Sequence, residues 1–92
     1  MEINVFYMSQ LKKAAGVPQE TIQVEGPCTV QRLLTESVCP RRARLCEIIR
    51  DHDGSFRPIL LTFVGDEQVD LATPFHLNDG DEVTLMFPIA GG

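Results

Sequence analysis

The chain has 92 residues, with 43% hydrophobic and 23% charged side chains, a composition typical of one folded domain rather than of a disordered chain. Thirteen acidic and eight basic residues give a formal net charge of −5. This balance argues against a nucleic-acid partner, which needs clustered cations, and against an anionic membrane surface. No stretch has the roughly 18 apolar residues of a membrane helix. Residues 1–4 lack the basic region of a signal peptide, so none is expected.

The cysteines are Cys28, Cys39 and Cys46. Because their number is odd and no pair has Cys-x-x-Cys spacing, we expect no disulfide framework and a reducing, cytoplasmic location. The favoured interpretation is three small, mostly buried side chains. Cys39 and Cys46 could share a helix face, but two sulfur ligands without a nearby histidine do not make a zinc site. An iron–sulfur cluster usually needs more cysteines than these, so we predict no metal site.

The first third of the chain predicts two strands. β-branched and aromatic residues favour a strand over 3–8, and alternation favours a second over 21–24. A short helical turn is expected between them over 10–15, with Ser9 as its N-cap and Gly16 at its end.

The main helix is expected after the break at Gly26-Pro27, with Thr29 as its N-cap. Pro40 stops this helix or starts the next one. Residues 41–47 look helical and carry three of the eight cations, interpreted as a solvated helix face or as a docking contact for an acidic partner. An apolar stripe at helical spacing predicts packing against one side of a sheet, and its members are Val30, Leu33, Leu34 and Val38.

Residues 48–57 allow two interpretations, a continuation of that helix or a hairpin arm. The arm is favoured because Asp53-Gly54 is a strong hairpin signal. His52 lies in the turn and is expected to be solvated rather than a ligand or a base.

The remaining strands complete the prediction of the fold. They are expected over 59–64, 68–70 and 83–87, with Pro88 ending the last one. The first and last strands are apolar at nearly every position, so we expect them to be central, parallel neighbours with the helix behind them. The predicted fold is an α+β roll of the β-grasp (ubiquitin-like) type, with a mixed sheet of four to five strands and one main helix on one face. It forms a single domain over 1–92.

Period-two alternation also predicts an apolar face on the far side of the sheet. One helix covers one face, and the other exposes a large apolar set, consisting of Phe6, Met8, Leu61, Phe63 and Met86. Since monomers rarely leave such a patch uncovered, we interpret it as a face for partner docking or homodimerisation. The alternative is that a loop or the hairpin arm covers it.

The end of the sequence, Gly91-Gly92, permits a specific chemistry. A glycine carboxylate has no Cβ beside it and can enter a narrow tunnel, Gly91 can adopt backbone angles closed to other residues, and Pro88 stiffens the point where the tail leaves the sheet. A partner enzyme could activate such a carboxylate as an acyl-adenylate, which a sulfur or amine nucleophile then attacks.

Nearly the whole chain resembles the ubiquitin-like sulfur carriers of the MoaD/ThiS family. The matching segments are the strand at 3–8, the helix at 29–38, the strand and turn at 61–67, the acidic turn at 78–83 and the end at 87–92. The acidic turn before the last strand, combined with the terminal Gly-Gly, is the most specific part of the match.

The resemblance implies a carrier rather than an enzyme. An E1-like adenylyltransferase would use ATP and magnesium on Gly92, and a sulfur donor would convert the adenylate to a thiocarboxylate. Gly91, Pro88, Ile89 and Ala90 would form a flexible tail over 88–92, and this chain would itself bind no cofactor. The charge of −5 would suit positively charged clefts on the partners.

The resemblance suggests two acceptor pathways. The tail looks like that of the molybdopterin synthase small subunit, with Phe87 where the first of two prolines usually stands. The segment from Arg44 through Gly54 and on to Glu67 is longer than in the shortest members of the family and looks similar to the arm of carriers for cysteine synthesis. The expected sulfur acceptor is therefore the large subunit of molybdopterin synthase or a synthase of the cysteine type. A thiamine pathway ranks lower because its carriers are usually shorter.

Two other classes of function stay open. One is a ubiquitin-like modifier joined through Gly92 to lysines of other proteins, and the other is a plain binding module of β-grasp shape. An independent enzyme is disfavoured because neither His52 nor His76 belongs to a convincing constellation of nucleophile and carboxylate.

Overall fold

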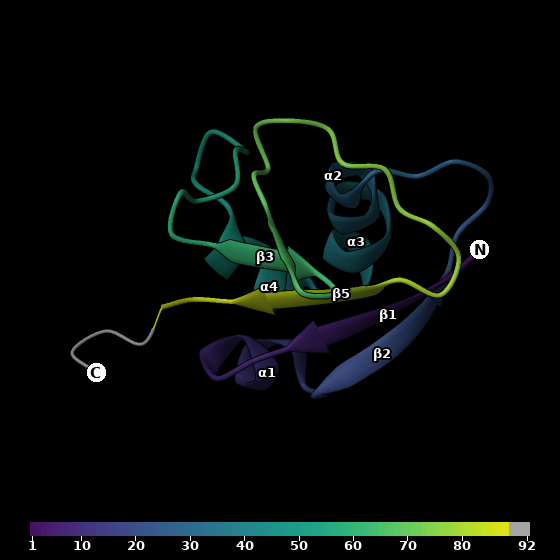
Figure 1. Cartoon of the computed structure of the whole chain (residues 1–92). Coiled ribbons are helices and arrows are strands. Elements are labelled where there is room, and N and C mark those ends of the chain that lie inside the picture. Colours follow the sequence, from purple (N-terminus) through teal and green to yellow (C-terminus); the bar gives the residue numbers. More distant parts are fainter. Residues whose placement is uncertain (89–92) are drawn as a thin grey trace.

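The computed structural model describes residues 1–88, and its centre is a five-stranded mixed sheet with strand order β2-β1-β5-β3-β4 (Figure 1). The strands are β1 (Glu2–Tyr7), β2 (Gln19–Gln23), β3 (Leu61–Val64), β4 (Glu67–Val69) and β5 (Glu82–Met86). β1 and β5 pair in parallel, and the other neighbours are antiparallel. The predicted parallel pairing of the first and last strands is confirmed.

The strands β1 and β5 lie at the centre of the sheet because their alternating apolar residues point into the core. Val5 pairs with Val83 and Tyr7 with Leu85, and all four side chains point to the core with at most 1% of their surface exposed. The strands predicted from the sequence lie at the right positions, but their predicted boundaries differ from those in the structure by up to two residues. β3 begins at Leu61 rather than at residue 59, because a turn in which the Leu60 N–H donates to the Arg57 carbonyl precedes it.

The short helix α1 (Gln10–Ala15) lies where the sequence predicts it, but Ser9 is not its side-chain cap. Ser9 has a φ of 51° and its side chain makes no capping hydrogen bond. The helix is ended by Gly16, whose φ of 84° belongs to the left-handed region and whose N–H donates to the Lys12 carbonyl. The hydroxyl that was expected to start α1 therefore contributes nothing to it.

The main helical run crosses one face of the sheet and has three parts, α2 (Val30–Arg32), the π-helical η1 (Leu33–Val38) and α3 (Cys39–Arg41). Thr29 caps it as predicted, since its Oγ1 accepts from the Arg32 N–H at 3.1 Å. The predicted apolar stripe is confirmed, because all four members are 0% exposed. Pro40 lies in the first turn of α3 and so starts a segment rather than ending one. In a regular helix its ring would crowd the carbonyl four residues back, and the wider π turn precedes this point.

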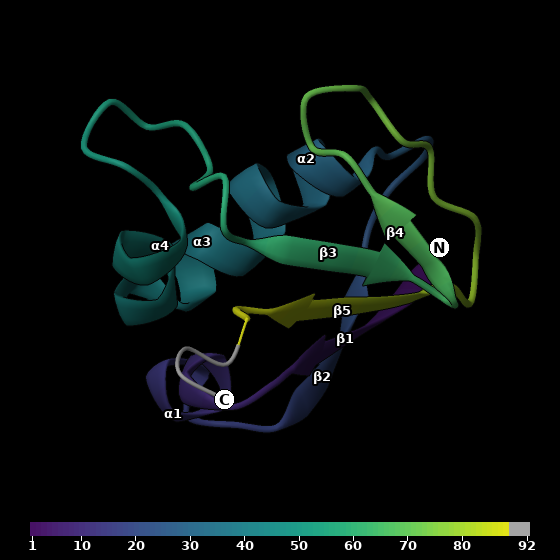
Figure 2. The ribbon, with the colours of Figure 1, turned by 60° about the vertical axis from the view of Figure 1, so that its left-hand side comes forward.

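Residues 48–57 combine both interpretations. The helix α4 (Ala43–Ile49) continues through Ile49, and a single bridge between Arg50 and Phe56 then closes a tight turn. We call residues 50–60 the arm. Figures 1 and 2 show α2, α3 and α4 on the same side of the sheet, so the prediction of one main helix was too simple.

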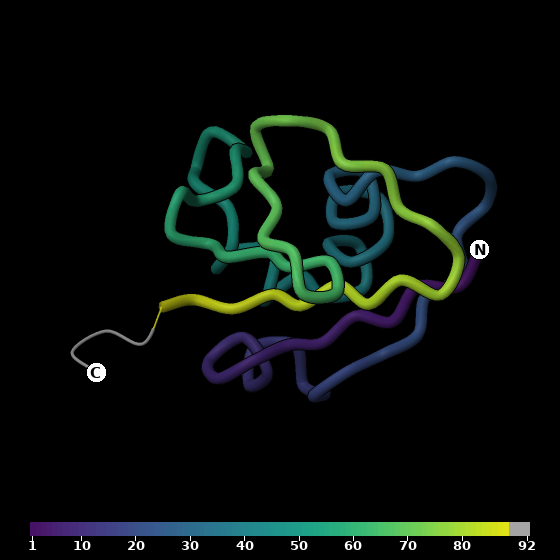
Figure 3. The backbone as a smooth tube through the Cα atoms, in the orientation of Figure 1, coloured from purple at the N-terminus to yellow at the C-terminus, as the bar shows by residue number. Residues whose placement is uncertain are grey.

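The long connection from β4 to β5 runs along the edge of the molecule beside the start of α2, as the backbone trace shows (Figure 3). It is fixed there by hydrogen bonds from Val30 N–H to the Phe75 carbonyl and from Leu77 N–H to the Cys28 carbonyl, each 2.9 Å long. The opposite face of the sheet is the face from which Figure 1 is viewed, with the helices behind.

Candidate functional site

The face of the sheet opposite the helices carries the apolar side chains that the sequence predicts. Phe6 and Phe63 both pair with Thr84 from opposite sides, and Leu61 pairs with Met86. These four apolar side chains are partly buried. Met8 follows the end of β1 and is 45% exposed. We call these five residues the apolar sheet face. The strand register places the first four on one side of the sheet, and the role of all five in docking stays a prediction.

The tail predicted to carry the chemistry starts at the end of this face. Phe87 is 7% exposed and continues the core side of β5, whereas Pro88 is exposed. The Met8 N–H donates to the Leu85 carbonyl at 3.1 Å, so Met8 and Pro88 leave the sheet at the same end. The other predicted tail residues lie outside the described part of the chain, and these are Ile89, Ala90, Gly91 and Gly92.

Charges are divided between the two ends of the sheet. The end where β1 and β5 begin is acidic, because the 79–82 turn bonds to Glu2 and to the β3–β4 turn. Its acidic residues are Glu2, Asp66, Glu67, Asp79, Asp81 and Glu82. The other end carries α1, which contacts both β5 and α4. Its exposed cations are Lys12, Lys13, Arg41 and Arg44. The tail therefore leaves from the basic end, which the net charge of −5 does not indicate.

A buried polar network, which the sequence analysis missed, joins β1, β2 and the corner between α3 and α4. The Tyr7 hydroxyl donates to Glu20. Arg42 donates to both carboxylate oxygens of Glu20 from Nε and an Nη, each at 3.0 Å, and to the Ala15 carbonyl at 3.1 Å. A tyrosine on the core side of a strand needs a partner for its hydroxyl, and that was the available signal.

This network shifts two acid–base equilibria. Burial raises the pKa of Tyr7, and the hydrogen bond to Glu20 raises it further. Burial opposes ionisation of Glu20, but hydrogen bonds from Arg42 and Tyr7 and the charges of Arg42 and Arg41 outweigh it, so the pKa of Glu20 is lowered. The ionised carboxylate is the form that the fold stabilises.

We expect Glu20→Gln to lower the free energy of unfolding by about 1–3 kcal/mol at pH 7, because charge-assisted hydrogen bonds in a mostly buried site are lost. The pKa of Glu20 is lower in the folded than in the unfolded chain, so this stabilisation is complete above the ordinary pKa of 4.5. It disappears as the pH falls through the lower, folded pKa. Urea unfolding of both proteins from pH 7 to pH 3 measures the difference.

The matched control is Glu36→Gln, which removes a carboxylate paired with Arg32 on a surface where the two side chains are 61% and 51% exposed. It should change stability by roughly 0.5 kcal/mol or less. A Glu20 variant as stable as this control at pH 7 would contradict the stabilising role of the network.

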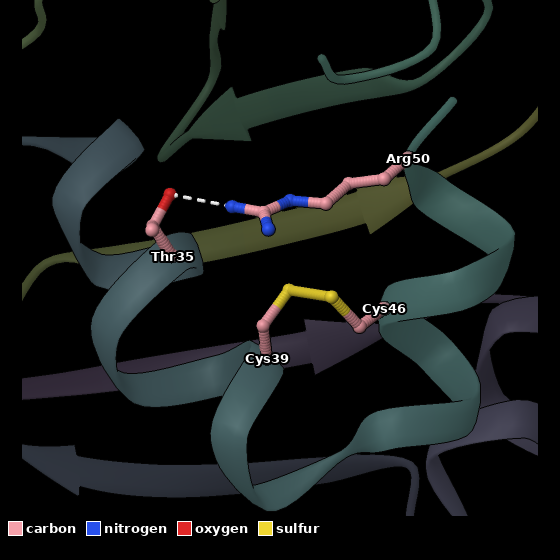
Figure 4. The surroundings of a disulfide bond; sticks show 4 residues. All are labelled: Thr35, Cys39, Cys46 and Arg50. Carbon is pink, nitrogen blue, oxygen red and sulfur yellow. Dashed lines mark hydrogen bonds between the residues drawn. A yellow bond between two sulfur atoms is a disulfide. The ribbon is translucent and has the colours of Figure 1, made fainter. Parts of the chain in front are cut away.

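Contrary to the expectation from the sequence, Cys39 and Cys46 form a disulfide (Figure 4). Seven residues of regular helix would separate their Cα atoms by about 10.5 Å, but they are 4.9 Å apart. The chain breaks at Arg42, with φ −131° and ψ 67°, and α4 folds back against α3. Cys28 is free and 4% exposed, as predicted.

Within residues 1–88, no cluster of three or more histidine, cysteine or acidic side chains has the arrangement of a metal site. Both histidines are exposed. His52 lies in the turn of the arm, and His76 forms an isolated bridge with Thr29. In the same part of the chain, no helix has the length and apolar character needed to cross a membrane.

Neither a family model nor a curated protein sequence matches the chain. Several solved structures match it. SAMP1 from Haloferax volcanii matches with a TM-score of 0.90 and 22% identity over 100% of both chains. Molybdopterin converting factor subunit 1 from Pyrococcus furiosus matches with a TM-score of 0.75 and 24% identity, over 97% of this chain and 99% of that one. The chain has the β-grasp, ubiquitin-like fold.

A chain of the Amycolatopsis orientalis BexX/CysO complex also matches, with a TM-score of 0.74 and 22% identity. The match covers 98% of the chain described here and 99% of the chain from that complex. The predicted fold class is therefore confirmed, and so is the resemblance in fold to the ubiquitin-like sulfur carriers. In this β-grasp chain, the apolar sheet face and the start of the tail adjoin one another at the basic end.

Proposed function

We propose that this β-grasp protein is a sulfur carrier, whose C-terminal Gly92 is adenylated by a partner enzyme and then converted to a thiocarboxylate. The observation that carries the proposal is the exit of the chain at Pro88, directly beside the apolar sheet face. A partner that binds this face would hold the segment after Pro88 at a fixed distance from its own active site. Positioning of this kind supplies much of the advantage of a bound reaction over one in solution.

The chemistry requires only a carboxylate from this chain. In the partner, a carboxylate oxygen attacks the α-phosphorus of ATP, pyrophosphate leaves, and an acyl-adenylate forms. A sulfur nucleophile then displaces AMP. Magnesium and ATP belong to the adenylyltransferase, while the carrier contributes the docking face and the reactive end. The carrier is thus a co-substrate rather than an enzyme.

The proposed sulfur acceptor is a synthase of molybdopterin or of cysteine biosynthesis. Support comes from the likeness in fold to molybdopterin converting factor subunit 1 and to the chain from the BexX/CysO complex, together with the resemblance of the tail to the small subunit of molybdopterin synthase. Genes for one of these pathways beside the gene for this chain would decide between them.

Conjugation to proteins is the second candidate function, favoured by the likeness in fold to a protein named small archaeal modifier protein 1. The two functions share the acyl-adenylate and differ in the nucleophile, which is the amine of a target lysine in conjugation. Immunoblots of a form tagged at the N-terminus would reveal adducts of higher mass. Adducts that vanish without Gly92 would favour the modifier function.

Intact mass spectrometry of the protein isolated from its native cell tests the carrier function. We expect a species heavier by the mass difference between sulfur and oxygen, located in the C-terminal peptide. If the purified chain, its cognate adenylyltransferase, ATP and a sulfur donor never yield this species, the carrier function is wrong.

The basic end of the sheet predicts an acidic rim around the partner's active site. Replacing Lys12 and Lys13 together by glutamate should slow association with the cognate adenylyltransferase by roughly tenfold at low salt, because opposite charges steer encounter. The difference should shrink as ionic strength rises. Stopped-flow measurement of the association rate at two salt concentrations checks this.

The acidic end offers the control for this prediction. Asp66→Lys combined with Glu67→Lys changes the net charge by the same magnitude, but with the opposite sign, at the opposite end of the sheet, where both side chains are exposed. This pair should leave the association rate within about twofold. The prediction of an acidic rim on the partner is wrong if the charge reversals at the two ends of the sheet slow association equally. It is also wrong if the reversals at Lys12 and Lys13 speed association.

A further inference from the structure

The Cys39–Cys46 disulfide lies in a surface hollow that the proposed function does not use. The hollow has a volume of about 510 Å³, and both cysteines line it. Its other lining residues come from α4 and the arm, and they are Ala43, Glu47, Arg50, Asp51, His52 and Arg57. A small molecule that enters this hollow therefore meets the disulfide directly.

The two sulfur-bearing residues differ in access. Cys46 is partly exposed, whereas Cys39 is 8% exposed. An attacking thiolate must approach one sulfur from outside while the other leaves. This difference makes Cys46 the sulfur that is attacked and Cys39 the one that leaves. The loop that the disulfide closes is short, so the gain in stability from cross-linking the unfolded chain is smaller than for a long loop.

Arg50 gives the hollow a fixed positive charge. Its guanidinium donates to Thr35 Oγ1 at 2.9 Å and lies 5.2 Å from the centre of the Phe56 ring. Figure 4 shows the side chain running from the end of α4 toward Thr35, alongside the disulfide. Within residues 1–88 it forms no ion pair, and its Nε is buried without a hydrogen-bond acceptor.

The other formal charges in the hollow are two carboxylates, Glu47 and Asp51, and one arginine, Arg57, so they sum to −1. Arg57 lies 3.9 Å from Asp51, and Glu47 and His52 are exposed. Of the two arginines that line the hollow, Arg50 is the one without an ion pair within residues 1–88. The hollow thus combines a partly exposed cysteine of the disulfide with an arginine that forms no ion pair within residues 1–88.

We propose that Cys39–Cys46 is a reversible thiol–disulfide exchange site for an anionic thiol of low molecular mass, which Arg50 attracts. The thiolate attacks Cys46 Sγ, a new S–S bond forms, and the bond to Cys39 breaks with its electron pair leaving on Cys39 Sγ. A second thiolate then attacks the small molecule's sulfur in the mixed disulfide and releases Cys46. In sum, two small thiols are oxidised to one disulfide while the protein disulfide is reduced to two thiols, and an excess of the oxidised small molecule reverses the exchange.

Reduction rates with two probe thiols test the proposal. Glutathione carries carboxylates and cysteamine carries an amine, so Arg50 should favour only the first. We expect Arg50→Gln to slow reduction by glutathione roughly five- to tenfold and not to slow reduction by cysteamine, because a positive charge repels its ammonium group. The comparison between variants cancels the difference in intrinsic reactivity of the two thiols. Rates are read from the mass increase after alkylation of the freed cysteines.

Arg32→Gln is the matched control, because Arg32 is an exposed arginine outside the hollow. It should change neither rate. In the unaltered protein, raising the ionic strength should slow disulfide reduction by glutathione and should not slow reduction by cysteamine. This comparison tests the role of charge without any substitution. The proposal is overturned if Arg50→Gln affects both thiols equally, or if reduction proceeds only at the rate of global unfolding.

Variants with one cysteine of the pair identify the attacked sulfur. Cys39→Ser leaves Cys46 to react with oxidised glutathione, and Cys46→Ser leaves Cys39. We expect the first to form a mixed disulfide at least about tenfold faster, with Cys28 unmodified in both, because burial controls access. Equal rates, or modification of Cys28 alone, would overturn the assignment. The proposed carrier function is tested separately, since exchange can be measured equally well in a chain that lacks Gly92.

Discussion

Deletion of Gly92 is expected to abolish formation of the thiocarboxylate, with a loss of at least about 1000-fold in the rate of adenylation. The new terminal carboxylate would lie one residue short of the partner's ATP, and misplacement of a reacting group by even about 1 Å can cost roughly 100-fold. The assay is ATP–pyrophosphate exchange with the cognate adenylyltransferase, followed by intact mass spectrometry after addition of a sulfur donor.

Two controls separate this chemistry from docking and from folding. The deletion should leave the thermal unfolding midpoint unchanged, because a terminal glycine has no side chain to pack and the core residues within 1–88 all lie before Pro88. The shortened chain should also still compete with the intact chain for binding to the adenylyltransferase, since the apolar sheet face is unchanged. Exchange activity that survives the deletion would refute Gly92 as the reacting residue.

Phe63→Asp should weaken binding to the partner by roughly 30- to 1000-fold, equivalent to about 2–4 kcal/mol, because a buried aromatic anchor is replaced by a charge. Phe63 lies on the solvent side of β3 between Thr84 and Gln68. The substitution removes no core contact, so the fold should persist. Calorimetric titration of the adenylyltransferase, with circular dichroism of each variant, measures both effects.

Thr21→Asp is the matched control for this face. Thr21 is exposed on β2 and pairs with Asn4, so it lies on the same side of the sheet but toward the opposite edge. We expect a change in affinity of about threefold or less. If Phe63→Asp binds as tightly as this control, the apolar sheet face is not where the partner docks.

The sheet could be predicted from the sequence because local pattern and burial agree there. Alternation in β1 and β5 places Val5 and Val83 in the core and Phe6 and Met86 on the far side, and the structure has them so. Parallel pairing of strands from the two ends of the chain followed from a general rule of connection. The strand register therefore places Phe6, Leu61, Phe63 and Met86 together, while their role in docking stays a prediction.

The helical layer was less predictable because distant contacts decide it. Arg42 leaves helical geometry where it donates to Glu20 and Ala15, and neither partner is local in sequence. That break brings Cys39 and Cys46 together, so the disulfide depends on a tertiary contact that spacing alone does not reveal. Ser9 failed as a cap for a related reason, since its backbone follows the turn leaving β1.

The parallel seam between β1 and β5 has a consequence for the synthesis and surveillance of this protein. The β1–β2 and β3–β4 hairpins are local and can form early, whereas β5 joins β1 from the far end of the chain, so closing the seam is the slow, cooperative step. Before that step the apolar sheet face is split into two halves, one at β1 and the other on β3 and β5. A partner that needs both halves together with the segment after Pro88 can bind only the folded protein. Incompletely folded chains would not be bound.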